Sequence, residues 1–415
     1  ISIRYLSDRM KLPSLNKFSY WNEALLTGQL PKPLANRYVV FDVDQGGLNN
    51  IRMAFDYVVV LTALTGRTLV MPVKSPWYLL DIGPIPDEHK GGATEFDDIY
   101  NIQALAKAIP VISTEEFIQI ASSHLEIPKE FQDSEAFNGE INRAWRDWLL
   151  ESTEIPGWNP YDTVICMPNI KAAMVGPHMD DAYLDGRTPV EFSAWMNAAP
   201  VLYFPSTQKY RSLGPVATML AGSDDTKPIL ARRLLKHHIR YSDEIFGLAN
   251  KIINALGLDY YDSIQIRGND FQYTKSMPGV EVICDNIGAL FDENLPIYVA
   301  SDETKDYVFD ELAAKLRCPK IFRWKDAESV VKEPIPFAWI GPLEQLICAG
   351  ARRFVGTDLS TFTSYIHRLR GYMQSEDQNL YFHNRHYSSV PKPTTADDFR
   401  GRNYLKENPL FWLSC

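Results

Sequence analysis

The second half of the chain alternates short apolar runs with longer amphipathic segments, and this alternation most constrains its fold. The apolar runs predict strands at 262–267, 296–301, 320–323 and 353–356. Around them, helices are predicted at 229–256, 279–291, 305–316, 341–351 and 360–371. Strands that alternate with helices of ten or more residues are typical of a parallel, doubly wound sheet.

The first half opens with a similar unit. Residues 38–42 predict a buried strand, Gly46 and Gly47 break it, and an apolar-rich helix is predicted at 48–64. Gly66 ends that helix, and a strand at 68–71 follows. Further on, the segment 74–160 is mixed, with a helix expected near 141–150, and strands are expected at 162–167 and 201–204. The opening unit predicts a second parallel α/β sheet.

The length and charge of the chain set further limits. With 415 residues, two domains are expected. We predict an N-terminal domain at 1–215, a C-terminal domain at 216–375, and a tail at 376–415 that packs back on the N-terminal domain. The loop at 205–228 would connect the two domains. A net charge of −10 argues against nucleic acid or anionic lipid as the main partner.

The cysteines bear on metals and compartment. The five are scattered without a Cys-x-x-Cys pair, so neither zinc nor a disulfide framework is predicted. This pattern and the lack of Asn-x-Ser/Thr sequons favour a cytoplasmic location, or the secretory lumen if an N-terminal anchor was removed. No membrane segment is predicted in the sequence shown.

Two small hydroxyl residues, Ser360 and Thr361, stand where the last predicted helix begins, directly after a short apolar strand. Such side chains cap the free N–H groups of a first helical turn. The same N–H groups and the helix dipole also bind phosphate. The segment 341–372 therefore predicts a site for a nucleotide phosphate, without indicating which nucleotide.

A polar loop, Asp42-Val-Asp-Gln-Gly-Gly-Leu-Asn-Asn-Ile-Arg52, follows the first strand. Paired glycines let the backbone approach a ligand closely. Asn49, Asn50 and Arg52 add amide and guanidinium donors in the first helical turn. On the glycines alone a plain tight turn is the favoured interpretation, because GxGxxG is absent and paired glycines are common. The polar residues favour a functional loop.

Two other strand ends carry charged residues. Arg267 ends the predicted strand 262–267 and could hold a diphosphate, or could pair with Asp270 or Asp302 to join two loops. Asp302 ends the strand 296–301 and could accept a bond from a ribose hydroxyl or cap the next helix. We expect Ser301 to be a helix cap.

Two more polar clusters carry weaker signals. His178-Met-Asp-Asp181 would hold a metal only if more ligands gathered there, and a solvated turn is the expected reading. Lys236-His237-His238 is predicted to be a solvated helix face.

Together these sequence segments resemble the GDP-fucose protein O-fucosyltransferase family and its wider superfamily, which includes the α-1,6-fucosyltransferases. The segment 46–52 is similar to the family's glycine/asparagine loop, and Ile264-Gln-Ile-Arg267 with Asn269-Asp-Phe271 to its His-x-Arg motif. The match is most specific from Glu344-Gln-Leu-Ile-Cys348 through Gly356-Thr-Asp-Leu-Ser360-Thr-Phe362. These motifs span most of the chain in the family's order.

The resemblance implies a GT-B fold, with two Rossmann-like domains facing each other across a cleft, and a metal-independent, inverting transfer from a GDP-sugar. Arg267 would hold the β-phosphate, and Ser360, Thr361 and Phe362 would line the diphosphate and sugar. Glu344 would contact the nucleoside, while Gly47 and Asn49 would approach the sugar and acceptor. The full predicted donor-binding set is Gly46, Gly47, Asn49, Asn50, Arg52, Gln265, Asp302, Glu344, Ser360, Thr361 and Phe362. No metal and no cofactor are predicted, since the GDP-sugar is a substrate.

The chain departs from the family pattern at two positions. Gln265 stands where the family usually has histidine, which keeps hydrogen bonding but removes a titratable group. Gly46 stands where some peptide O-fucosyltransferases carry a catalytic glutamate. The nearest carboxylate is Asp44, which is predicted to be the general base.

The sequence therefore predicts a fucosyltransferase that uses GDP-fucose and a glycan or protein acceptor. A rhamnosyltransferase that uses a nucleotide-linked deoxysugar is one alternative. A catalytically inactive carbohydrate-binding protein, or a regulatory sugar-nucleotide binder, is another. The acceptor is not indicated, because loops such as 83–98 and 170–190 match no known motif.

Overall fold

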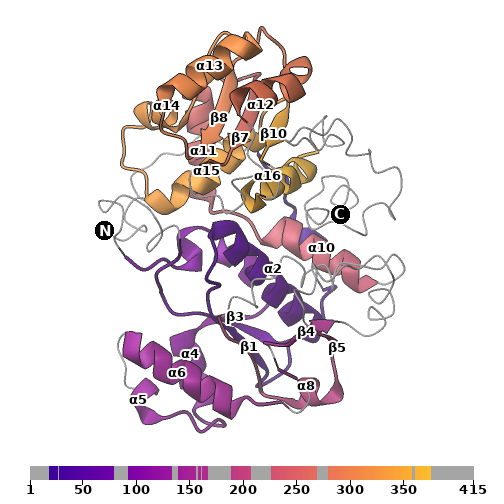
Figure 1. Cartoon of the computed structure of the whole chain (residues 1–415). Coiled ribbons are helices and arrows are strands. Elements are labelled where there is room, and N and C mark those ends of the chain that lie inside the picture. The colour runs from indigo at the N-terminus through magenta and orange to yellow at the C-terminus, as the bar shows by residue number, and fades with distance from the viewer. Residues whose placement is uncertain are drawn as a thin grey trace. The chain divides into compact units, whose positions relative to one another are not determined.

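The structure, a computed structural model, describes residues 18–26, 28–78, 92–132, 139–155, 158–159, 161–166, 188–206, 226–268, 279–357 and 360–374. The chain forms two compact units (Figure 1). One comprises Trp21–Arg240, which we call the N-terminal unit. The other, the C-terminal unit, comprises residues 18–20 and the described residues from Tyr241 onward. The predicted domain boundary at 215/216 and the tail at 376–415 lie outside the described residues.

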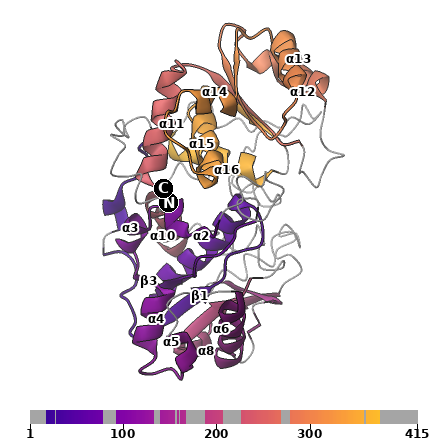
Figure 2. The ribbon, with the colours of Figure 1, turned by 90° about the vertical axis from the view of Figure 1, so that its left-hand side faces the viewer.

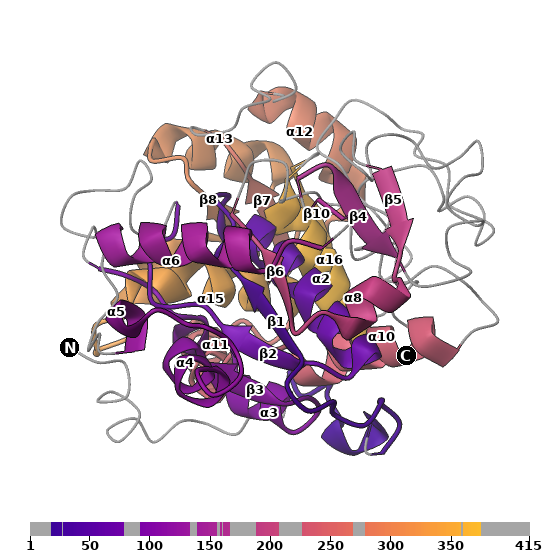
Figure 3. The same cartoon turned by 90° about the horizontal axis from the view of Figure 1, so that it is seen from below.

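The N-terminal unit is built on a four-stranded parallel sheet in the order β3-β2-β1-β6 (Figure 3). Its strands are β1 (Tyr38–Phe41), β2 (Thr68–Met71), β3 (Val111–Ser113) and β6 (Val201–Phe204). Strand β1 is central and pairs Tyr38 with both Thr68 and Val201. The predictions for β1, β2 and β6 are confirmed, whereas β3 was not predicted.

Helices cover both faces of this sheet. Helix α2 (Leu48–Thr65) covers one face, where Phe55 stacks on Phe41 with ring centroids 5.9 Å apart. The other face carries α4 (Thr114–Ala121), α5 (Lys129–Gln132) and α6 (Gly139–Ser152). There Phe117 meets Tyr38 edge-on, 4.8 Å apart. Because successive strand residues point to opposite faces, the apolar run of β1 supplies both cores.

The other elements of the N-terminal unit surround this sandwich. They are η2 (Glu23–Leu26), η4 (Phe96–Asp98), α3 (Ile102–Ala106), β4 (Thr163–Cys166), β5 (Thr188–Glu191), α8 (Ala194–Ala198) and α10 (Thr226–His238). The predicted strand at 162–167 is confirmed as β4, but it forms a separate two-stranded sheet with β5. Helix α10 packs on α2 and η2.

The C-terminal unit has its own four-stranded parallel sheet, in the order β10-β7-β8-β9. The strands are β7 (Asp262–Ile266), β8 (Ile297–Ser301), β9 (Ile321–Phe322) and β10 (Phe354–Gly356). Helices α12 (Val280–Ile287) and α13 (Asp306–Leu316) pack on one face through Ile264 and Val299. On the other face lie α11 (Asp243–Ala255), α15 (Phe337–Ala349) and α16 (Thr361–Tyr372), side by side (Figure 2). The short elements η7 (Gly288–Leu290) and α14 (Trp324–Ser329) complete the unit.

Each unit therefore has the Rossmann-like, parallel α/β architecture that was predicted. In the part of the chain that the structure describes, every helix is too short or too polar to cross a membrane.

The single long helix predicted at 229–256 is wrong, because the structure has two helices there. Helix α10 ends at His238, and α11 begins at Asp243 after Ser242, whose hydroxyl accepts a bond from the Ile245 N–H. A side chain that caps a first turn favours a new helix start over a continuous helix. The two units meet in sequence at this break.

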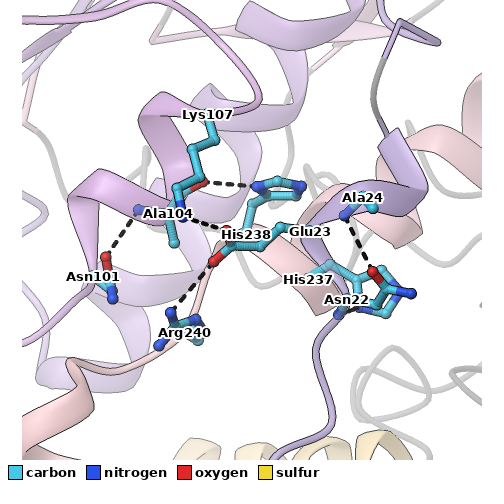
Figure 4. Close-up of polar contacts among 9 residues, drawn as sticks. All are labelled: Asn22, Glu23, Ala24, Asn101, Ala104, Lys107, His237, His238 and Arg240. Carbon is cyan, nitrogen blue, oxygen red and sulfur yellow. Dashed lines mark hydrogen bonds and ion pairs between the residues drawn. The ribbon is translucent and has the colours of Figure 1, made fainter.

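The solvated face predicted at Lys236, His237 and His238 is also wrong, since these side chains are 3%, 2% and 2% exposed. Figure 4 shows why: the end of α10 lies among polar groups of η2 and α3. The Asn22 N–H donates to His237 Nδ1 over 3.0 Å, and His238 Nδ1 lies 2.7 Å from the Ala104 carbonyl. Glu23 pairs with Lys107 and Arg240 in the same cluster.

Candidate active site

Arg267 follows the carboxyl end of β7 in the C-terminal unit. Its Nη1 lies 3.4 Å from Asp302 Oδ2, beyond the end of the neighbouring strand β8, and both side chains are about one quarter exposed. Asp302 Oδ1 also accepts a 2.6 Å bond from the Gly268 N–H. Asp302 therefore holds both the guanidinium group and the turn that follows it. The predicted alternative of an Arg–Asp pair forms with Asp302, and the guanidinium remains accessible to a ligand.

Ser301 does not cap a helix, contrary to the prediction. Helix α13 begins later, at Asp306, and its N-cap residue is Lys305. The Ser301 hydroxyl instead donates to the Ile266 carbonyl and accepts from the Glu303 N–H. Ser301 thus ties the end of β8 to the end of β7, and this tie supports the turn that carries Arg267.

Gln265 connects β7 to the start of α16. Its buried side-chain oxygen accepts a 2.6 Å bond from the Thr363 hydroxyl and a longer bond, 3.4 Å, from the Thr357 N–H. The Thr357 hydroxyl in turn donates to the Gln265 carbonyl and accepts from the Arg267 N–H over 2.8 Å. The strand end that carries Arg267 is therefore fastened to the loop that enters α16.

The first turn of α16 lies very close to β10. A Cβ atom on Gly356 would stand 2.3 Å from the side chain of Thr363, so only glycine fits there. Ser360 is the N-cap residue of α16, but its side chain makes no cap hydrogen bond. The hydroxyl cap expected from the sequence does not form. Gln345 Nε2 of α15 donates to the Phe362 carbonyl over 3.2 Å, and this hydrogen bond connects α15 to the first turn of α16.

Glu344 lies on α15 near the same strand ends. Its Oε1 accepts a 3.3 Å bond from the Tyr298 hydroxyl of β8. Burial raises the pKa of Glu344 to about 8, against the lowering effect of the Tyr298 bond, and the negative charge of Asp302 adds to the rise. A carboxyl group with this pKa is largely protonated at neutral pH, so it can donate as well as accept a hydrogen bond.

In the N-terminal unit, the loop after β1 is held by Asp44. Its Oδ1 accepts a 2.7 Å bond from the Gly46 N–H, and the side chain is only 3% exposed. The Asn50 side chain lies against Gly46, where a Cβ atom would stand 2.5 Å from it. Gly47 then caps α2 without a side-chain bond, and Asn49 is buried in the first turn.

Arg52, one turn further along α2, is 1% exposed. Its Nη1 lies 2.6 Å from Asp56 Oδ2 in a buried pair within the helix. The Arg52 guanidinium group thus has a carboxylate partner inside the protein. A contact of Arg52 with the sugar nucleotide remains a prediction from the sequence.

The structure also reveals a residue that the sequence reasoning did not assign, Asp42. Asp42 directly follows β1 and lines a cavity of about 490 Å³ together with Asp44, Trp145, Arg146 and Ser206. An acidic residue at the end of a predicted buried strand was a signal that could have identified it.

The predicted residues therefore form two groups. The C-terminal unit gathers the donor group, which comprises Gln265, Arg267, Asp302, Glu344, Ser360, Thr361 and Phe362. The N-terminal unit holds the loop group, Asp44, Gly46, Gly47, Asn49, Asn50 and Arg52. Asn269 to Phe271 and His178 to Asp181 lie outside the described residues. Among the residues that are described, no three His, Cys, Asp or Glu side chains gather as a metal site would require.

Several solved structures are similar to this one, although their sequence identity to it is low. POFUT1 in complex with GDP is 17% identical with a TM-score of 0.43, over 81% of this chain and 96% of that one. POFUT1 in complex with GDP-fucose is 16% identical with a TM-score of 0.41, over 81% and 95%. The fucosyltransferase NodZ from Bradyrhizobium is 13% identical with a TM-score of 0.39, over 80% and 92%. No curated protein sequence matches the chain.

A family model matches far more of the sequence than any single motif does. The model, described as GDP-fucose protein O-fucosyltransferase, matches residues 38–373, more than three quarters of the chain. The match includes β1, the polar loop that follows it, the turn after β7 that carries Arg267, and α16. The chain belongs to the GDP-fucose protein O-fucosyltransferase family and is a glycosyltransferase.

Proposed function

We propose that the protein transfers fucose from GDP-fucose to a hydroxyl group of a glycan or protein acceptor, in an inverting and metal-independent reaction. Family membership supports the reaction class. The observation that carries the proposal is the position of Arg267. Its N–H bonds to Thr357, on the loop that enters α16, and its guanidinium is held by Asp302. The Arg267 guanidinium group and the N-terminus of α16 therefore lie at the same edge of the C-terminal sheet.

This arrangement suits the departure of a nucleoside diphosphate. In the proposed transfer, the acceptor oxygen bonds to the anomeric carbon of fucose while the bond from that carbon to the β-phosphate oxygen breaks. Negative charge then builds on the phosphate, and a fixed guanidinium and helix N–H groups stabilise it. Arg267 would supply the positive charge that a divalent metal supplies in other transferases.

The other residues have proposed roles around the same donor. Ser360, Thr361 and Phe362 would line the diphosphate and sugar, and Glu344 would contact the nucleoside as a hydrogen-bond donor or acceptor. Asp302 and Gln265 would hold Arg267 and α16 in position.

In the N-terminal unit, the loop from Gly46 to Asn50 would approach the sugar and acceptor. The Asn50 Oδ1 atom is buried and has no hydrogen-bond partner among the described residues, which fits a ligand contact. The transfer also needs a proton acceptor in this unit, and the sequence predicts Asp44 for that role.

A thermal-shift panel tests the donor. We expect GDP and GDP-fucose to raise the melting temperature of the protein, and UDP and UDP-rhamnose to have little effect. A response to UDP-rhamnose that exceeds the response to GDP-fucose would favour a rhamnosyltransferase. A protein that binds free sugars but no nucleotide would be a carbohydrate-binding relative without activity.

A further inference from the structure

The cavity beside β1 contains two carboxyl groups, and they differ in access. It has a volume of about 490 Å³, within the range of small-molecule sites, and opens where β1, β2 and β6 end. Asp42 and Asp44 both line it. The Asp42 side chain is 20% exposed, whereas Asp44 is 3% exposed.

The hydrogen bonds of Asp42 use one oxygen only. Asp42 Oδ2 accepts from Arg146 Nε at 3.0 Å, from the Tyr203 hydroxyl at 2.9 Å and from the Ser206 N–H at 2.9 Å. These donors come from α6, from β6 and from the residue two positions beyond it. The described residues offer no hydrogen-bond partner to Oδ1. The carboxylate is therefore fixed in orientation with one oxygen left for a ligand.

Asp44 is placed differently. Its Oδ1 accepts the Gly46 N–H at 2.7 Å, and its Oδ2 is fully buried. Asp44 is therefore the less accessible of the two carboxyl groups that line the cavity. The hydrogen bond from the Gly46 N–H to Asp44 fixes the turn that leads into α2, so Asp44 positions this loop.

We propose that Asp42 is the general base for the acceptor hydroxyl, and that Asp44 organises the glycine loop; this inference rests on the proposed fucosyl transfer. The acceptor O–H proton passes to Asp42 Oδ1 as the acceptor oxygen bonds to the anomeric carbon. The electron pair of the broken carbon–oxygen bond leaves on the β-phosphate of GDP. The acceptor is a neutral hydroxyl compound, because the lining beyond Asp42, Asp44 and Arg146 is uncharged, with Trp145 and Tyr78 as flanking rings.

The electrostatic setting of Asp42 agrees with this role. Desolvation raises the pKa of Asp42, although the Ser206 amide, Arg146 and Tyr203 each act to lower it. The titratable and charged groups that face it are Arg146 of α6, Tyr203 of β6, Tyr161 ahead of β4, and Asp44 on the same loop. A raised pKa makes the carboxylate a stronger base.

The test measures release of fucose from GDP-fucose, with water as the acceptor, for the full chain and its Asp42→Asn variant. The amide oxygen of asparagine can still accept the three donors, so the fold is expected to persist. Because a general base contributes about 10²-fold or more, we expect at least that loss in kcat, with the melting temperature and GDP affinity kept. Asp147→Asn, an exposed carboxylate next to Arg146, is the matched control and should keep the wild-type rate.

A pH profile separates a base from a structural residue. The wild-type rate should fall on the acidic side as Asp42 becomes protonated. That limb should disappear in Asp42→Asn but remain in Asp44→Asn, whatever its rate. A persisting limb in Asp42→Asn, or a rate within about threefold of wild type, would overturn the inference while leaving the proposed transfer intact. A wild-type protein that binds no GDP-fucose and releases no fucose would overturn both.

Discussion

The side-chain oxygen of Gln265 accepts a 2.6 Å hydrogen bond from the hydroxyl of Thr363, and this bond joins the carboxyl-terminal part of β7 to the first turn of α16. Two residues beyond Gln265, Arg267 leaves the sheet, and Thr363 lies in the turn that would face a phosphate. The buried side chain of Gln265 therefore has a hydrogen-bond partner on α16. We infer that it sets the distance between the guanidinium group and the helix N-terminus.

Removing the Thr363 hydroxyl should weaken this connection. In Thr363→Val the buried Gln265 oxygen keeps only its 3.4 Å contact with the Thr357 N–H. A buried acceptor that loses its main partner costs about 1–3 kcal/mol. Denaturant unfolding should show that loss, together with a higher KM for GDP-fucose. The exposed Thr304→Val is the control and should change stability by less than about 0.5 kcal/mol. Equal stabilities for the two variants would contradict the proposed connection.

Asp302 should influence catalysis through Arg267. Asp302→Asn keeps an oxygen for the Gly268 N–H but loses the charge that faces the guanidinium group. An ion pair between partly exposed side chains is worth up to about 1 kcal/mol, so we expect kcat/KM to fall about two- to fivefold. The melting temperature should change little, because both side chains are partly exposed. Steady-state kinetics with GDP-fucose check this, and an unchanged kcat/KM would show that Arg267 needs no such support.

Glu344 should make stability depend on alkaline pH. Its pKa in the folded protein is about 8, mainly because of burial, against an ordinary value of 4.5. The folded state therefore favours the protonated form. The contribution is fully present below about pH 4.5 and is lost as the pH rises through about 8.

The Glu344→Gln variant tests this dependence. Melting temperatures between about pH 5 and pH 9 should decline less steeply in Glu344→Gln than in the wild type. The exposed Glu311→Gln should follow the wild-type curve. Parallel curves for all three proteins would mean that Glu344 titrates at an ordinary pH.

His237 should destabilise the N-terminal unit in acid. Burial lowers its pKa to about 4, and the positive charges of Lys236, His238 and Arg233 add to this effect. The unfolded chain, with a histidine pKa of about 6.5, binds the proton first. The contribution is therefore present above about pH 6.5 and is lost as the pH falls toward 4.

A glutamine at this position can still accept the Asn22 N–H but cannot titrate. His237→Gln should flatten the fall in melting temperature between about pH 6.5 and pH 4, whereas the exposed His124→Gln should leave it unchanged. The opposite ranking of the two variants would show that the acid sensitivity arises elsewhere.

Most strands were predictable because their apolar runs are bounded by clear stop signals. Strand β6 and strand β2 have their predicted bounds, since Pro205 and Pro72 follow them closely. Strand β3 has three residues that are all only half-buried, so it gave no apolar run to recognise. The break between α10 and α11 carried a signal in Ser242 and the two acids after it, but the apolar pattern continues across it.

Helix boundaries and burial were harder to predict. Helix α15 was expected to start at Gly341, yet it begins at Phe337, with Pro342 inside the helix. The sequence pattern located Arg267, Asp302 and Ser360 near one sheet edge. It did not indicate that Arg52 is buried against Asp56 or that Asp42 is more accessible than Asp44. Both facts depend on burial, which is set by how distant parts of the chain pack.

Fucose transfer from radiolabelled GDP-fucose, measured for the wild-type protein and for Arg267→Ala, tests the role of this arginine. The wild type should release GDP together with transferred or free fucose. Arg267→Ala should lose about 10²-fold or more in kcat, because a fixed donor to the departing phosphate is removed. Its melting temperature should be kept, and the exposed Lys332→Ala should retain the wild-type rate. Wild-type turnover in Arg267→Ala would contradict the central claim that this arginine stabilises the departing GDP.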